Sequence, residues 1–191
     1  MTPGGPEEAV HGGRLVFVCY ANHCRSPMME LLLRAALDRS TAPAPLLVSS
    51  AATHARPGTP AHPYAVRALV EHGVDATGWR STRLDLEGIE RADLVLTAAA
   101  EQRQEVVGTS EAAADRTFTL LDFSAWLAAA PSTAPAGAAV PDLLLRAAAG
   151  RDRLPDRRER DLPDPMGRSL RHFRICRRRI EAALRPFLAG G

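Results

Sequence analysis

The stretch VFVCYANHCRSPMMELLLRAAL, residues 16–37, joins an apolar β-branched run to an apolar pattern of helical spacing. Residues 14–18 predict a strand that is buried on both faces. From Pro27 onward apolar residues recur at helical spacing, and a proline suits the first turn of a helix. The turn between the two elements, CYANHCRS, holds two cysteines, an arginine and a serine. Such a turn needs an explanation beyond the connection of two elements.

The rest of the chain continues the alternation of strand and helix. The apolar patterns predict further strands over residues 46–50, 93–97 and 116–121, and helices over 65–72, 86–91, 101–107 and about 169–188. Strands that alternate with helices indicate an α/β fold with a parallel sheet and helices on both faces.

The length of 191 residues suits one domain. We expect residues 1–13 to be a flexible tail, because they lack the basic and apolar regions of a secretory signal. Residues 14–191 then form the single domain. Within it, residues 124–162 mix alanine-rich helical pieces with proline and glycine, which predicts one or two short helices and a mobile loop rather than a second domain.

Charge and cysteine content exclude several classes of protein. The 24 basic and 22 acidic residues nearly balance, at a formal charge of +2, which gives no case for a nucleic-acid or membrane partner. No run of eighteen apolar residues predicts a membrane span. Three cysteines without a signal peptide favour a reducing cytoplasm over a disulfide framework, and their spacing does not match a zinc site. We therefore expect no metal and no cofactor.

The CYANHCRS turn has the chemistry of a phosphate site with a nucleophile. Peptide N–H groups that curl between a strand end and a helix start bind a multiply charged anion. The expected phosphate-binding residues are Tyr20, Ala21, Asn22, His23, Cys24 and Arg25. The guanidinium of Arg25 matches two phosphoryl oxygens, and Cys19 lies at the bottom of the cup, where these groups and Ser26 stabilise its thiolate. The alternative is a buried cysteine beside a helix cap.

A phosphate ester also needs an acid to protonate its leaving oxygen. Asp164 lies in the segment LPDPMG, residues 162–167, between two prolines that restrict the backbone. It is the candidate acid, and an ordinary Asp-Pro turn is the alternative.

Together these segments resemble the low-molecular-weight protein tyrosine phosphatase family, from about residue 15 to residue 188. The matching stretches are VFVCYANHCRSPM, VSSAATHA, LVEHGVDATGWRSTRLDLEGIERADLVLTAA and DLPDPMGRSL. The resemblance implies a three-layer α/β sandwich with a four-stranded parallel sheet of order 2-1-3-4.

The resemblance also implies a role for each matching residue. Cys19 would form a phosphocysteine, Arg25 would hold the phosphoryl oxygens, and Asp164 would act as the acid and then as the base. Ser26 would hydrogen-bond the thiolate, and Asn22 with Ser50 would support the loop. Cys24 would trap oxidised Cys19 as a reversible disulfide.

Two residues depart from the family pattern. The family usually has glycine at the position of Ala21, and a positive φ there would cost alanine about 1 kcal/mol. The family usually has an aromatic residue at the position of Met166, which with Tyr20 and His23 would line the rim of the substrate pocket. A methionine wall is softer and less selective for a flat ring.

The leading interpretation is a phosphomonoester hydrolase that acts on protein phosphotyrosine and releases inorganic phosphate. A phosphatase for a small metabolite or for phosphoarginine is the alternative. Thiol-dependent arsenate reduction ranks lower, because no cysteine lies between Cys24 and Cys176. A non-catalytic phosphate-binding module needs neither Cys19 nor Asp164. Neither the substrate nor the oligomeric state follows from the sequence.

Overall fold

The fold is built on a parallel sheet of four strands in the order β2-β1-β3-β4. The computed structural model describes residues 12–39, 46–131, 139–151 and 161–188. The strands are β1 (Arg14–Cys19), β2 (Leu47–Ala52), β3 (Leu94–Thr97) and β4 (Thr117–Thr119). The observed order confirms the predicted 2-1-3-4 sheet.

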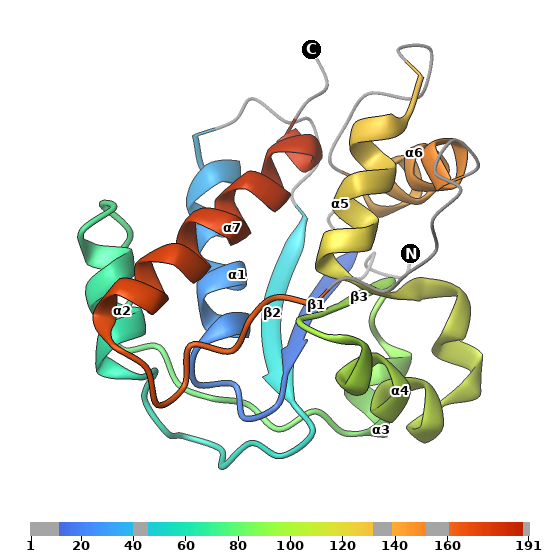
Figure 1. The fold of residues 1–191 in the computed structure, drawn as a ribbon. Helices are drawn as coiled ribbons and strands as arrows, with labels where there is room; N and C mark the ends of the chain where they lie inside the picture. The colour runs from blue at the N-terminus through green and yellow to red at the C-terminus, as the bar shows by residue number, and fades with distance from the viewer. Residues whose placement is uncertain (1–11, 40–45, 132–138, 152–160, 189–191) are drawn as a thin grey trace, which may run out of the picture.

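Helices cover both faces of the sheet, which gives the three predicted layers. One core cluster joins Leu15 and Phe17 of β1 to five helices: α1 (Arg25–Leu37), α2 (Pro63–Val70), α5 (Leu120–Ala129), α6 (Val140–Arg151) and α7 (Leu170–Leu188). A second cluster contains Val18 of β1 on the opposite face. There the sheet meets α3 (Leu86–Glu90), α4 (Ala100–Thr109) and the 3-10 helix η1 (Glu111–Arg116). Figure 1 shows α1, α2 and α7 on one side of the sheet and α3 and α4 on the other.

Successive residues of β1 enter different cores. Leu15 and Phe17 are fully buried in the first cluster, and Val18 is fully buried in the second. Because both faces of this central strand are covered, its sequence reads as a continuous apolar run rather than as an alternation.

Several predicted boundaries shift by one or two residues in the structure. Helix α1 begins at Arg25, two residues before Pro27. The fourth strand, predicted over residues 116–121, ends at Thr119. The Thr119 hydroxyl accepts a hydrogen bond from the Asp122 amide and thereby caps α5, so Leu120 begins a helix.

The described part of the 124–162 segment packs onto the domain through α5 and α6. Gly150 of α6 lies against the backbone of Trp126 in α5, where an added Cβ would be 1.7 Å from the Trp126 carbonyl oxygen. A side chain at residue 150 is therefore incompatible with this packing. Residues 132–138 and 152–160 of the predicted mobile loop lie outside the described residues.

The predicted N-terminal tail falls mostly outside the described residues, which begin at Gly12. The carbonyl of Gly12 accepts from the Val140 amide at 2.6 Å, and that of Gly13 accepts from the Leu47 amide at 2.9 Å. These two residues therefore join β1 to α6 and to β2.

The C-terminal ends of the strands carry the segments of interest. The CYANHCRS turn leaves β1 there, where Cys19 is paired with Ala52 of β2. The Leu162 amide donates to the Ala98 carbonyl just after β3, at 2.8 Å. This bond brings the Asp164 loop, 145 residues away from Cys19 in sequence, to the same edge of the sheet.

Candidate active site

A five-residue loop, residues 20–24, connects the end of β1 at Cys19 to the start of α1 at Arg25. Within the described residues, Asn22 is the one non-glycine residue with a positive φ, at 54°. Asparagine tolerates this left-handed conformation better than most residues. Ala21 does not have a positive φ, so the strain that we considered for this departure from the family pattern does not arise.

The Asn22 side chain holds the loop in this conformation. Its amide nitrogen donates to Ser26 Oγ at 2.7 Å and to Ser50 Oγ at 2.9 Å. Its amide oxygen accepts from the Thr82 backbone N–H at 2.8 Å. Asn22 is fully buried, so these bonds satisfy its polar atoms and fix the loop between α1, β2 and the segment before α3.

The direction of these hydrogen bonds bears on whether Ser26 can donate a hydrogen bond to Cys19. Cys19 Sγ lies 3.0 Å from Ser26 Oγ. Because Asn22 donates to Ser26, the serine oxygen already accepts a hydrogen bond and its own proton is available for the sulfur. Ser26 can therefore donate a hydrogen bond to the atom that would act as the nucleophile.

Two residues that the sequence analysis did not assign to the site extend this network. Ser50 donates to Glu30 Oε2 at 2.6 Å, and Trp79 Nε1 donates to the same oxygen at 3.0 Å. Glu30 is buried on α1, one turn after Ser26. The spacing of four residues on one helix was the available signal for Glu30. No sequence spacing connects Trp79 to this carboxylate.

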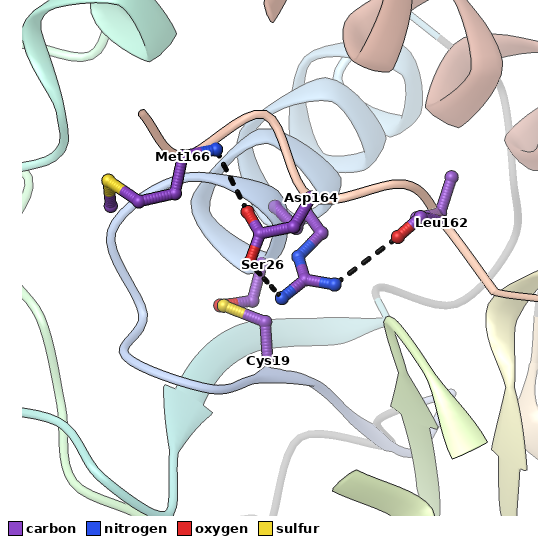
Figure 2. A network of polar contacts seen from close by, with 6 residues as sticks. Cys19, Ser26, Leu162, Asp164 and Met166 are labelled. Atoms are coloured by element: carbon purple, nitrogen blue, oxygen red, sulfur yellow. Dashed lines mark hydrogen bonds and ion pairs between the residues drawn. The ribbon is translucent and has the colours of Figure 1, made fainter. Parts of the chain in front are cut away.

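The loop that carries Asp164 lies against Arg25. The guanidinium of Arg25 donates to Asp164 Oδ2 at 2.8 Å and to the Leu162 carbonyl at 3.2 Å. The other carboxylate oxygen of Asp164 accepts from the Met166 amide at 3.0 Å. Figure 2 shows the Asp164 carboxylate between these two donors, with Cys19 and Ser26 nearby.

The Arg25–Asp164 pair is half open to solvent. Arg25 is buried, while 49% of the Asp164 side chain is exposed. The carboxylate thus occupies one side of a guanidinium fork that is suited to two phosphoryl oxygens. A phosphate group that takes the N–H now bound to Asp164 has to displace this carboxylate.

The predicted rim residues differ in exposure. Tyr20 and Met166 are 49% and 45% exposed, and His23 is partly buried. The His23 carbonyl accepts from the His62 amide at 2.8 Å, which ties the loop to the N-terminus of α2. The Tyr20 ring is stacked on the ring of His54, which was not among the predicted rim residues.

All three cysteines are buried and free. Burial, followed by the charge of Cys19, raises the pKa of the Cys24 thiol above its ordinary value. Burial also raises the pKa of Cys176 to about 12. Both groups therefore stay protonated at neutral pH.

Within the described residues, no group of histidine, cysteine, aspartate and glutamate side chains is arranged to hold a metal ion. None of the described helices is both long enough and apolar enough to cross a membrane.

Known proteins are similar to this chain in fold and in sequence. Residues 14–130 match the model of the low molecular weight phosphotyrosine protein phosphatase family. A probable low molecular weight protein-tyrosine-phosphatase EpsP of Ralstonia solanacearum is 38% identical over 92 residues, 48% of this chain and 59% of that protein. The match thus spans less than two thirds of that relative.

A second relative has a different activity in its name, and a solved structure shows the same fold. A protein-arginine-phosphatase of Bacillus subtilis is 36% identical over 109 residues, 57% of this chain and 71% of that protein. The crystal structure of a YwlE mutant from Bacillus subtilis superposes with a TM-score of 0.70 at 26% identity, over 91% of this chain and 95% of that chain.

The family match covers more than half of the chain and includes the CYANHCRS turn, β1 and α1. The sheet order and the superposition agree with it. This chain therefore belongs to the low molecular weight phosphotyrosine protein phosphatase family.

Proposed function

We propose that this protein hydrolyses protein phosphotyrosine through a phosphocysteine intermediate, without metal or cofactor, and releases inorganic phosphate. The observation that carries the proposal is the contact between Cys19 Sγ and Ser26 Oγ at 3.0 Å, with Ser26 already accepting from Asn22. The Ser26 hydroxyl can donate to the sulfur of Cys19, and the loop that follows Cys19 leads into Arg25, whose guanidinium matches a phosphoryl group.

In the first step, the phosphoryl group binds the N–H groups of residues 20–25 and the fork of Arg25. The Asp164 side chain leaves the guanidinium and acts as the general acid. The thiolate of Cys19 attacks phosphorus, an S–P bond forms, and the bond from phosphorus to the leaving oxygen breaks. Asp164 gives its proton to that oxygen.

In the second step, a water molecule attacks the phosphorus of the phosphocysteine. Asp164, now a carboxylate, takes a proton from this water. The S–P bond breaks, the electron pair returns to Cys19, and inorganic phosphate is released. Arg25 stabilises the phosphoryl oxygens in both transition states. A reducing compartment such as the cytoplasm suits this cycle, because Cys19 has to remain a free thiol.

The activity is tested with p-nitrophenyl phosphate in the presence of EDTA. We expect hydrolysis by the wild type and competitive inhibition by vanadate. The Asp164→Asn variant should lose about 10²-fold in kcat, because it cannot protonate the leaving oxygen. The matched control is Asp161→Asn, whose carboxylate accepts from the Ala100 amide instead of contacting Arg25. A wild type without activity under reducing conditions would contradict the proposal and favour a binding module.

Phosphoarginine is the second candidate substrate. Met166 replaces the aromatic wall that favours a flat tyrosine ring, and one relative is a protein-arginine-phosphatase at 36% identity. Two peptides of the same sequence, one with phosphotyrosine and one with phosphoarginine, separate the candidates by their kcat/KM values. A small phosphorylated metabolite remains the interpretation if neither peptide is hydrolysed while p-nitrophenyl phosphate is.

We also propose that Cys24 protects Cys19 from irreversible oxidation. Hydrogen peroxide converts the Cys19 thiolate to a sulfenic acid, and the Cys24 thiol then displaces water from it to form a disulfide. The raised pKa of Cys24 keeps this thiol protonated, and a protonated thiol reacts slowly with peroxide, so Cys24 remains available to trap the sulfenic acid of Cys19.

After peroxide treatment and reduction by dithiothreitol, we expect the wild type to regain most of its activity. The Cys24→Ser variant should regain only a small fraction of its own untreated activity, since nothing traps its sulfenic acid. Cys176→Ser is the control, because it removes another buried thiol but retains Cys24. Equal recovery of Cys24→Ser and the wild type would exclude this role.

A further inference from the structure

Tyr20 directly follows Cys19, and its ring is held by a residue from another part of the chain. The rings of Tyr20 and His54 are stacked, with centroids 4.5 Å apart and planes within 13° of each other. The His54 backbone N–H also donates to the Tyr20 carbonyl at 3.2 Å. Both the backbone and the ring of Tyr20 are therefore tied to His54, just after β2.

Glu105 of α4 in turn orients His54, through Thr53. The Thr53 hydroxyl donates to Glu105 Oε2 and lies 3.0 Å from His54 Nδ1. Since its single proton goes to the carboxylate, the Thr53 oxygen has to accept from His54. Nδ1 of His54 therefore carries a hydrogen, and it lies 3.8 Å from the Glu105 carboxylate. This arrangement fixes both the tautomer and the ring orientation of His54.

We propose that the stacked pair of Tyr20 and His54 selects substrates with a planar leaving group, and that Glu105 is the positioning residue that holds this pair in place. Tyr20 is 49% exposed although one face of its ring packs against His54. A ring fixed in this way can stack on a flat leaving group, such as an aryl ring, and loses little rotamer freedom when it does so.

The inference rests on the proposed phosphatase function, since it names the residues that select the leaving group of the substrate at the opening of the same site. It also explains how the site can select a planar leaving group although Met166 stands where the family usually has an aromatic residue. The flat wall that the family usually has after its Asp-Pro pair is provided instead by Tyr20 and His54.

The test compares two phosphonates by calorimetry, because phosphonates bind without being hydrolysed. Phenylphosphonate carries a planar group and methylphosphonate does not. We expect Glu105→Gln and His54→Ala to weaken phenylphosphonate binding about two- to tenfold, the worth of one aromatic contact. Methylphosphonate binding should change less than twofold. His54→Phe should retain the wild-type affinities, since phenylalanine restores the stack without the hydrogen bonds.

Glu101→Gln is the matched control, because Glu101 is exposed one turn earlier on the same helix. With p-nitrophenyl phosphate, Glu105→Gln should raise KM and leave kcat within about twofold, as expected when binding alone is affected. Equal weakening of both phosphonates would show a general disturbance of the loop and overturn the proposal, as would no change in either. A wild type that binds phenylphosphonate but hydrolyses nothing would refute the proposed function and leave this inference standing.

Discussion

Replacement of Cys19 by serine is expected to lower the kcat for p-nitrophenyl phosphate by about 10⁴-fold or more. A serine hydroxyl remains protonated at neutral pH and is a far weaker nucleophile than a cysteine sulfur. The side chain that lies against the sulfur of Cys19 is the Ser26 hydroxyl, which accepts from Asn22 and can donate to the sulfur. The Ser26 hydroxyl is too weak a base to take the proton from a serine at residue 19, so the attack on phosphorus fails.

This variant should still bind phosphate. The loop amides and Arg25 are unchanged, so calorimetry with inorganic phosphate should give a dissociation constant within a few-fold of the wild-type value. Cys176→Ser is the control for the loss of a buried thiol, and we expect it to keep its activity. More than about one hundredth of wild-type activity in Cys19→Ser, after any contaminating phosphatase is excluded, would show that residue 19 is not the nucleophile.

The sequence was sufficient for the parts of the fold that are determined by local pattern. The apolar run before Cys19 predicts a strand buried on both faces, and such strands belong to parallel sheets covered by helices. The fourth strand shows the limit of this reasoning. Thr117–Thr119 continues into Leu120 and Leu121 without a glycine, a proline or a charged residue to mark the boundary, and the capping bond of Thr119 starts the helix there.

The residues of the candidate site likewise fall into those that local sequence predicts and those that it does not. Cys19, Arg25 and Ser26 are fixed relative to each other by one turn and one helix start, so their spacing carries the signal. Contacts between distant segments leave no spacing to detect. Trp79 reaches Glu30 across 49 residues, and Glu105 reaches Thr53 across 52. Each partner has an ordinary role in its own segment, and only the tertiary fold brings them together.

Replacement of Arg25 by lysine is expected to lower kcat by about 10³-fold, although the charge is retained. The guanidinium reaches Asp164 Oδ2 and the Leu162 carbonyl with two different nitrogens. A phosphoryl group in the transition state needs two such parallel donors, and a lysine provides a single ammonium. The lysine variant should therefore fold and bind phosphate, but stabilise the transition state poorly.

The measurement is kcat and KM with p-nitrophenyl phosphate, alongside thermal unfolding to confirm that the variant is folded. Arg67→Lys is the matched control, because Arg67 is an exposed arginine on α2 that pairs with Glu71, and we expect less than a twofold change. Activity of Arg25→Lys within tenfold of the wild type would mean that one positive charge suffices. The planar fork would then have no special role, and the ion pair with Asp164 would be a structural contact rather than the resting state of a phosphate site.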